Sequence, residues 1–322
     1  MSYAIDVIVP VYNRAHCIAN LIETLNRQTF RDFRAILVDD GSTDGSADKI
    51  RELLPRATFP CLFIEKENGG AGSARNAGLQ AATARYISFI DSDDGLHPEF
   101  LEYFYTAATE TDADLCLCNL EMIPEGSGKS PTPLGALTYE RITAAEGMKI
   151  FCTRWIGPVC LFMNRHWQQE NHLIFDENCI YCEDAPFITN VIAAADKVAY
   201  IPLQTYIYYT HQGSLHRSPR LDKYQSAIES FRKVEDRLAK EDSDVARVFN
   251  QMGGIRYFIA NLRRGAVQMN YKNFLALCKM VDFPRYRKNV KYLQQRSQRL
   301  ACRLALLSKP LFYSVSRLLF KD

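Results

Sequence analysis

The sequence predicts an α/β fold in which helices flank both faces of a mostly parallel sheet and a helical extension follows. Three observations predict it. In the first 120 residues, short apolar segments of strand length alternate with segments whose apolar residues recur at helical spacing. Three of the apolar segments end in polar clusters, which is where parallel sheets bind ligands. From Leu221 onward the pattern is helical.

The expected elements follow one another in a regular order. Strands are expected at residues 5–11, 33–38, 61–64 and 86–90, and helices at 17–25, 46–54, 73–82 and from near Pro98. Such a strand–helix series forms a parallel sheet with helices on both faces. A loop rich in Pro, Gly and Ser then covers 124–135, and strands are expected at 199–201 and 205–209.

Bulk composition is that of an ordinary globular chain, with 47% hydrophobic and 24% charged residues among 322. No apolar run reaches the roughly 18 residues that cross a bilayer. We expect no signal peptide, because the N-terminus contains Asp6 and enters a strand at once. The ten cysteines are therefore expected to be reduced and mostly buried. The single C-x-x-C pair, Cys179 and Cys182, lacks the second pair of a structural zinc site.

The run Asp91-Ser92-Asp93-Asp94 closes the fourth strand. If the strand continues, Asp91 and Asp93 point the same way, roughly 7 Å apart, and repel each other unless water or a cation separates them. A hard divalent cation, Mn²⁺ or Mg²⁺, suits two carboxylates and leaves positions for phosphate oxygens. The alternative is a solvated turn in which Asp93 or Asp94 caps the helix near Pro98.

The glycine-rich segment 67–78 follows a strand and opens a helix, which is the context of an anion-binding loop. Arg75 stands where a dinucleotide-binding motif has its third glycine, and no Gly-Lys-Ser/Thr ends the segment as in a P-loop. One interpretation is that the segment places a helix N-terminus and Arg75 near a diphosphate. The alternative is that its glycines only allow neighbouring chain segments to approach closely. Asp40 can accept a hydrogen bond from a base or ribose, or serve an Asp-Gly turn.

Two further pairs carry possible chemistry. Glu183 and Asp184 precede a helix, so one acid can cap it and the other can act as a general base. His211 and His216 flank a short loop, where one imidazole can complete a metal site. Helix capping and plain loop positions are the alternatives for these pairs.

The charge is distributed unevenly along the chain. Residues 285–321 contain ten Lys or Arg and no acid, whereas the remainder carries a net charge of −8. One helical face in this tail collects apolar side chains, namely Leu311, Phe312, Val315, Leu318 and Leu319. A basic helix with an apolar stripe is typical of an interfacial anchor on anionic lipid. Docking on the rest of the chain, or pairing with a second copy, are the alternatives.

Together these segments resemble the family 2 glycosyltransferases, whose GT-A fold has a Rossmann-like sheet. The likeness covers about residues 4–110 and is carried by residues 8–13, 26–30, 38–46, 68–78 and 89–94, with a weaker likeness at 175–184. The resemblance implies an inverting hexosyl- or N-acetylhexosaminyl-transferase. It would move a sugar from a nucleotide donor, usually UDP, to a saccharide hydroxyl in bacterial surface polysaccharide, lipopolysaccharide or capsule synthesis.

The resemblance also implies roles for individual residues. Pro10, Tyr12 and Asp40 would hold the nucleotide base of the donor, Arg75 and Asn76 would lie near its phosphates or sugar, and Asp91 would contact the ribose or sugar. Asp93 would ligate Mn²⁺ or Mg²⁺, with Asp94 as the alternative ligand. Asp184 would be the general base of the reaction, with Glu183 as the fallback. Residues 1–120 then form the nucleotide-sugar-binding half, residues 121–220 the acceptor-binding half, and residues 221–322 the basic helical region.

These features predict a cytoplasmic enzyme, peripheral on the inner face of the cytoplasmic membrane, with a saccharide acceptor that can be lipid-linked and with no nucleic-acid partner. A nucleotide-binding oxidoreductase would leave Asp91 and Asp93 without a role, and nucleic-acid binding through the tail would ignore the acidic cluster. A nucleotidylyltransferase would need a glycine-rich loop directly after the first strand, where residues 10–13 lack it.

Overall fold

The computed structural model describes residues 3–210, 220–293 and 295–319, so His211 and His216 lie outside the described residues. The strands are β1 (Ile5–Val11), β2 (Phe33–Asp39), β3 (Cys61–Glu65), β4 (Tyr86–Phe89), β5 (Gly95–Leu96), β6 (Leu115–Pro124), β7 (Glu140–Ile142), β8 (Leu161–Asn164) and β9 (Val198–Thr210). The helices are α1 (Ile18–Asn26), α2 (Ser46–Leu53), α3 (Ala71–Ala81), α4 (Phe100–Thr111), α5 (Ala144–Thr153), α6 (Arg165–Glu170), α7 (Asp184–Ala194), α8 (Leu221–Leu238), α9 (Asp244–Gln268), α10 (Tyr271–Lys279), α11 (Phe283–Tyr286), α12 (Arg296–Leu307) and α13 (Lys309–Leu319).

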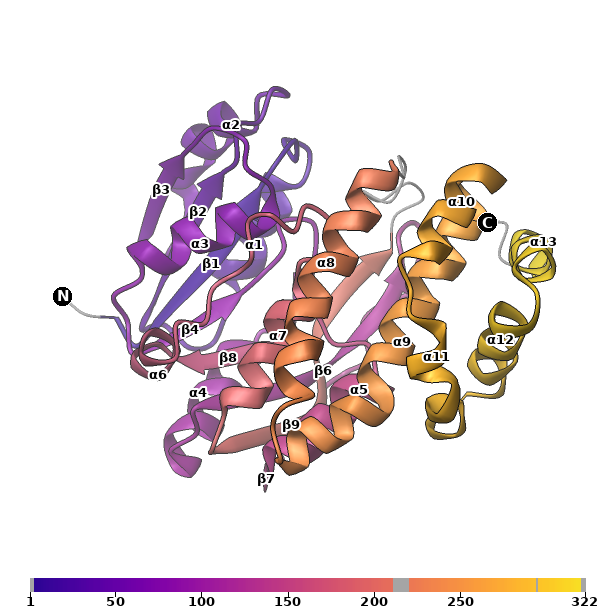
Figure 1. Ribbon diagram of the computed structural model, residues 1–322. Helices are drawn as coiled ribbons and strands as arrows, with labels where there is room; N and C mark the ends of the chain where they lie inside the picture. The colour runs from indigo at the N-terminus through magenta and orange to yellow at the C-terminus, as the bar shows by residue number, and fades with distance from the viewer. Residues whose placement is uncertain (1–2, 211–219, 294, 320–322) are drawn as a thin grey trace.

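The described strands form a single sheet in the order β3-β2-β1-β4-β8-β6-β9-β5, with β7 beside β9 (Figure 1). As predicted, β3, β2, β1 and β4 are parallel. The second half is mixed, because β8 runs antiparallel between β4 and β6, while β6 and β9 are parallel. The regular alternation of strands and helices ends after α4, so nothing in the sequence pattern predicted this reversal. The two strands expected at 199–209 are one strand, β9.

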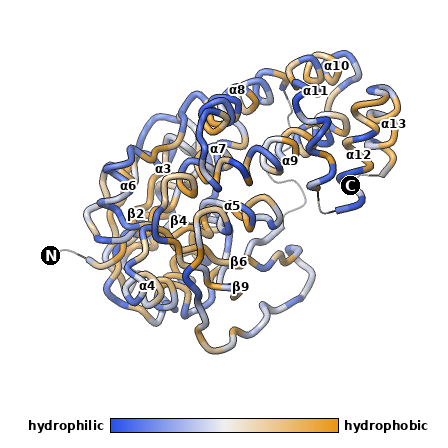
Figure 2. The backbone as a smooth tube through the Cα atoms, turned by 60° about the horizontal axis from the view of Figure 1, so that its bottom comes forward, coloured by the Kyte–Doolittle hydropathy of each residue, from blue (hydrophilic) through white to orange (hydrophobic). Residues whose placement is uncertain are grey.

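Side chains that alternate along the central strands divide the core between the two faces of the sheet. Val7 and Val9 of β1 belong to the cluster that includes buried residues of α1, α2 and α4. Ile8 belongs to the other cluster, with buried residues of α3, α5 and α7 to α10. The sheet strands are accordingly hydrophobic along most of their length in Figure 2. All ten cysteines are free thiols and seven are buried, which confirms the sequence prediction.

The basic tail packs in part on the rest of the chain. Phe312 of α13 is buried against Phe274 of α10, with ring centroids 6.0 Å apart, and the Tyr313 hydroxyl donates to the Met269 carbonyl at 2.9 Å. Leu307 and Leu318 remain 83% and 81% exposed. The tail is therefore docked through one face and apolar on another. Within the described ranges, no helix is long and apolar enough to cross a membrane.

Asp6 interrupts the apolar strand β1 and is fully buried. Its carboxylate accepts from the Arg34 guanidinium at 2.8 and 3.0 Å, and from the backbone N–H groups of Thr83 and Ala84 at 2.6 and 2.8 Å. A buried carboxylate is stable only when it is paired and hydrogen-bonded in this way. Asp6 therefore fixes β1, β2 and the start of β4 relative to one another.

We expect Asp6→Ala to lower the free energy of unfolding by about 3–5 kcal/mol, because it leaves Arg34 and two backbone N–H groups, one of them buried, without their partner. Urea denaturation followed by circular dichroism measures this change. Glu23→Ala, which removes an exposed pair with Arg27, is the matched control and should cost no more than about 1 kcal/mol. Equal losses in both variants would contradict this role for Asp6.

Candidate active site

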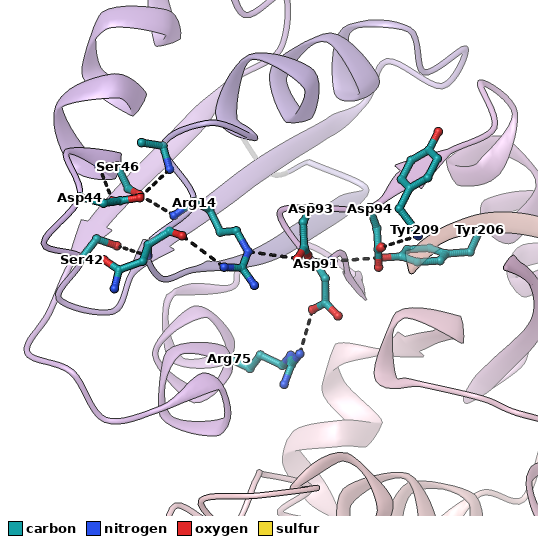
Figure 3. Close-up of polar contacts among 12 residues, drawn as sticks. Arg14, Ser42, Asp44, Ser46, Arg75, Asp91, Asp93, Asp94, Tyr206 and Tyr209 are labelled. Atoms are coloured by element: carbon teal, nitrogen blue, oxygen red, sulfur yellow. Dashed lines mark hydrogen bonds and ion pairs between the residues drawn. The ribbon is translucent and has the colours of Figure 1, made fainter. Parts of the chain in front are cut away.

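The loops that follow β1 and β2 are tied to each other at the carboxyl edge of the sheet. Backbone N–H groups of Asn13 and Arg14 donate to the hydroxyls of Ser42 and Ser46 at 2.9 and 2.8 Å. Asp44 accepts from the Ala15 N–H at 3.0 Å and also binds Ser46. Figure 3 shows this network beside the acidic turn that follows β4. Two strand ends therefore form one wall of the site.

Asp40 organises the glycine-rich loop. Its buried carboxylate accepts from the Lys66 ammonium at 2.8 Å, the Asn68 amide at 3.2 Å, and the Gly69 and Gly70 N–H groups at 3.0 and 2.7 Å. Four donors fill the lone-pair positions of both oxygens. Asp40 therefore positions this loop, and its expected contact with a nucleotide base stays a prediction.

The acidic run 91–94 is a turn and not a continuation of β4, which ends at Phe89. The turn is closed by the Asp94 N–H, which donates to the Asp91 carbonyl at 3.2 Å. The side chains of Asp91 and Asp93 are 31% and 20% exposed. Neither Asp93 nor Asp94 caps α4, whose N-cap residue is Glu99 and has no side-chain cap. The capping alternative considered from the sequence is therefore wrong.

Asp94 is buried beneath the same turn. It accepts from the Tyr206 hydroxyl at 2.7 Å and from the Tyr209 N–H at 3.1 Å, both on β9 (Figure 3). Burial, with the nearby Asp91 charge, raises the pKa of Asp94 to about 9. Because Asp94 is 1% exposed and both of its oxygens accept hydrogen bonds from β9, it is poorly placed to ligate a metal. Asp91 and Asp93 are therefore the carboxylates that the turn presents to solvent.

Arg75 of α3 lies between two acids from distant parts of the chain. Its buried guanidinium donates to Asp91 at 2.8 Å and to Glu183 at 2.9 Å. The guanidinium carbon lies 5.3 Å from the centre of the Phe175 ring. The two acids raise the pKa of Arg75 against the opposing effect of its burial, so it stays charged. Arg75 thus joins the acidic turn to the segment that begins α7.

Asn76 and Gly72 complete the contact between α3 and residues 175–183. The Asn76 amide accepts from the Phe175 N–H at 2.9 Å and donates to the Phe175 carbonyl and the Glu177 carboxylate at 3.0 and 2.9 Å. A Cβ atom on Gly72 would lie 3.2 Å from Phe175 and 3.5 Å from Glu183. The close-approach interpretation of this glycine is therefore confirmed by the packing.

Glu183 and Asp184 have different surroundings. Neither side chain caps α7 in the usual way, since Glu183 pairs with Arg75, and Asp184 accepts from the Ala185 N–H at 2.8 Å. Burial and the neighbouring Glu183 charge raise the pKa of Asp184 to about 6, against the opposing charges of Arg75 and Arg264. Asp184 is thus a carboxylate at neutral pH without an ion pair among the described residues.

Arg14 is a site residue that sequence reasoning missed. Its Nε donates to Asp93 at 3.0 Å from the loop after β1 (Figure 3). Its position directly after Asn13, in the first polar strand end, was the available signal. Tyr12 and Pro10 lie on this loop and strand, and the Tyr12 ring is exposed.

The donor set fits a hard divalent cation. Asp91 and Asp93 are oxygen donors that face solvent from one turn, and Mg²⁺ is usually held by one or two carboxylates together with substrate phosphates. Among residues 3–210, 220–293 and 295–319, no group of three or more His, Cys, Asp or Glu is placed to hold a metal ion. A protein-only cage is thus absent from that part of the chain.

The sequence profile described as Glycosyl transferase family 2 matches residues 6–178, more than half of the chain. The chain belongs to this family. This membership sets aside the oxidoreductase and nucleotidylyltransferase alternatives.

Two curated relatives illustrate the likeness. The chain is 31% identical over 226 residues to glycosyltransferase GlyA of Streptococcus pneumoniae, covering 66% of this chain and 31% of GlyA. It is 32% identical over 221 residues to the uncharacterized glycosyltransferase EpsJ of Bacillus subtilis, covering 67% of this chain and 63% of EpsJ. The chain thus spans about a third of GlyA and slightly less than two thirds of EpsJ.

Staphylococcus aureus TarS, a poly(ribitol-phosphate) beta-N-acetylglucosaminyltransferase, is 25% identical over 249 residues, covering 75% of this chain and 41% of TarS. The crystal structure of a TarS fragment with UDP-GlcNAc superposes with a TM-score of 0.73 at 19% identity, covering 98% of this chain and 90% of that one. This likeness confirms the predicted GT-A type of fold with a helical C-terminal region.

We expect Asp40→Asn to loosen the glycine-rich loop, because an amide NH₂ group would replace one acceptor that faces several donors. Amide hydrogen exchange at Gly69 and Gly70 should accelerate, and stability should fall by about 1–3 kcal/mol. Glu65→Gln, at a half-exposed neighbouring acid, is the control. Unchanged protection at Gly69 and Gly70 would contradict the assignment of Asp40 as the organiser of the loop.

Proposed function

We propose that the chain transfers a sugar from a UDP-sugar to a saccharide hydroxyl, with inversion, in the synthesis of a bacterial surface polysaccharide. One observation carries the proposal: Arg75 pairs with both Asp91 of the acidic turn and Glu183, so the two groups of acids lie close together around a single guanidinium. Transfer from a donor diphosphate to an acceptor hydroxyl needs a metal-binding group and a general base close to each other. The UDP-GlcNAc bound by TarS supports the donor class, and the poly(ribitol-phosphate) in its name supports a hydroxyl on a polymer as the acceptor.

On the donor side, the exposed Tyr12 ring and Pro10 offer a surface on which a base can stack, next to the loop that Asp40 organises. The N-terminus of α3, which follows the glycine-rich loop, would provide backbone N–H groups for phosphates. Asp93 and Asp91 would hold Mn²⁺ or Mg²⁺, which would neutralise charge on the departing diphosphate. Arg14, which pairs with Asp93, would then lie beside the metal ligands.

On the acceptor side, Asp184 is the proposed general base. An acceptor hydroxyl is a weak nucleophile at neutral pH, and a carboxylate within about 3 Å removes its proton during attack. Glu183 is less suited because its ion pair with Arg75 occupies one of its two carboxylate oxygens. Glu183 would instead orient Arg75 between the two substrates.

Asp93→Asn should lower metal-dependent hydrolysis of UDP-GlcNAc by at least about 10–100-fold, the loss that follows removal of even an outer-shell partner of a metal. EDTA should abolish the activity of the unmodified chain. Release of the nucleoside diphosphate from a panel of UDP-, GDP- and dTDP-sugars measures both effects. Asp112→Asn, at an exposed acid paired with Lys197, is the control and should retain full turnover. Full turnover by Asp93→Asn, or turnover insensitive to EDTA, would refute the assignment.

The transfer rate should depend on pH through Asp184. Because the base acts only when deprotonated, and its pKa is raised to about 6, kcat should be constant above pH 7 and fall about tenfold per unit below pH 6. Asp184→Asn should abolish transfer while UDP binding, measured calorimetrically, is retained. A Glu183→Gln variant that loses the pH dependence, with Asp184→Asn keeping it, would assign the base to Glu183 instead.

We further propose that the tail binds the anionic inner leaflet of the cytoplasmic membrane, where a lipid-linked acceptor would be available. A groove of about 370 Å³ is lined by Arg287, Lys288, Lys291 and Arg303 together with Val290, Leu306 and Leu307. None of these four cations has an ion pair with an acid among the described residues, and Leu307 is almost fully exposed beside them. Cations without an ion pair can bind the phosphates of lipid head groups, and the exposed Leu307 beside them can insert among the acyl chains.

Truncation of the tail would expose Phe274, so charge reversal is the cleaner test. Arg287→Glu, Lys288→Glu and Arg303→Glu combined should weaken co-sedimentation with phosphatidylserine vesicles at least about 100-fold, since each cation contributes about 1 kcal/mol. The control reverses three exposed cations elsewhere, Arg27, Lys197 and Lys240. Equal sedimentation of both variants would end the membrane proposal.

A further inference from the structure

A second concavity lies on the long strands β6 and β9, apart from the acidic turn. It has a volume of about 690 Å³ and is lined by Asn119, Leu120, Met122, Thr132, Pro133, Leu134, Gly135, Arg154, Trp155, Pro202, Leu203 and Gln204. We call it the β6–β9 groove. The two strands shift register at Cys118, Asn119 and Leu120, which interrupts regular pairing beside the groove. A volume of this size accommodates a small ligand.

An exposed aromatic side chain forms one wall of the groove. Trp155, between α5 and β8, is 41% exposed, and its ring centroid lies 4.8 Å from that of Tyr208 at a tilt of 46°. Tyr208 supports one side of the indole, so that the ring is held in place while part of its surface stays open to solvent. Exposed indole is costly to leave uncovered, and its rigidity lowers the entropy lost when a ligand packs on it.

The strand β9 contributes residues both to the surroundings of the groove and to the candidate active site. Tyr206 and Tyr208 are two residues apart on this strand and therefore project from the same face. The Tyr206 hydroxyl donates to Asp94 in the acidic turn, whereas the Tyr208 ring packs on Trp155. Through Tyr206 and Tyr208, β9 therefore contacts both the acidic turn and the Trp155 indole.

A fixed guanidinium lies next to the indole. Arg154 donates to the Asn119 amide oxygen at 2.9 Å and to the Tyr200 hydroxyl, and the Tyr200 hydroxyl itself donates to Asn119 at 2.9 Å. In the part of the chain that the structure describes, no carboxylate pairs with Arg154. Its remaining N–H groups are therefore held in a set orientation for a ligand with several oxygen atoms.

We propose that the β6–β9 groove binds a saccharide unit of the acceptor other than the unit that receives the new sugar. The C–H groups on one face of a pyranose ring would pack on the Trp155 indole, whose π-face is electron-rich, while ring hydroxyls would accept from Arg154 and bond with the exposed Gln204 amide. This inference rests on the proposed function, because it assumes a saccharide acceptor. It adds that the enzyme recognises a chain of at least two sugar units.

The chain contains only two tryptophans, which makes the groove directly observable. In a Trp167→Phe background, in which the nearly buried Trp167 is removed, the fluorescence reports Trp155 alone. The full chain is titrated with neutral and anionic hexasaccharides, namely chitohexaose, cellohexaose, maltohexaose and a hyaluronan hexasaccharide. At least one hexasaccharide should shift the Trp155 emission to shorter wavelength in a saturable manner. Comparison of the neutral and anionic hexasaccharides shows whether Arg154 favours hydroxyl or carboxylate oxygens.

Variants then separate the groove from the reacting centre. By calorimetry on an otherwise unmodified chain, Trp155→Ala should weaken binding of that hexasaccharide at least tenfold and leave UDP-GlcNAc hydrolysis unchanged. Tyr271→Ala, at an exposed aromatic on α10, is the control and should bind normally. The inference would be overturned if none of the four hexasaccharides binds at about 10 mM, a concentration high enough to reveal a millimolar dissociation constant. Unchanged binding by Trp155→Ala would also overturn it. Hydrolysis that fails in the unmodified chain would instead count against the proposed function, because hexasaccharide binding is measured without a donor.

Discussion

The site depends on one buried cation. Arg75 places its guanidinium between Asp91, at the end of β4, and Glu183, at the start of α7, although these acids lie 16 and 108 residues from it in the chain. Its Nε has no hydrogen-bond partner among the described residues and lies beside the Phe175 ring. Loss of either acid would leave part of this buried guanidinium without its partner and would destabilise the fold, so the native structure favours the approach of both acids. The distance between the proposed metal-binding turn and the proposed base is thereby fixed by the stability of the fold.

The neighbouring contacts serve the same arrangement. Asn76, the next residue of α3, bonds the backbone of Phe175 through both ends of its amide, and Gly72 lets that segment approach the helix. Asp40 holds the glycine-rich loop against the second strand. Each of these residues looks like a ligand contact in the sequence, but each is used to place another part of the site. The proposed ligand contacts fall instead on groups that are at least partly exposed, such as Asp91, Asp93 and Tyr12.

Much of the first half of the fold was predictable because its signals are local. Apolar runs that alternate with helical patterns give the parallel strands β1 to β4, and the acids at their ends mark the correct edge of the sheet. The pairing of Arg75 with Glu183 and of Arg14 with Asp93 was not predictable, because spacing in a sequence says nothing about which side chains meet across 79 or 108 residues. The burial of Asp94 depends on Tyr206 and Tyr209 of β9, so the sequence pattern could not separate it from its exposed neighbours. The sequence likewise gives no signal for Trp155, because its contact with Tyr208 is visible only in the structure.

The central claim is that Arg75 and Glu183 form one unit that holds the two halves together. A double-mutant cycle on the free energy of unfolding, with Arg75→Met, Glu183→Gln and the combined variant, tests it most directly, because this cycle needs no substrate. A coupling energy of about 1–3 kcal/mol between the two positions is the predicted result. Additivity of the two single losses to within about 0.5 kcal/mol would show that the bridge does not set the geometry of the site.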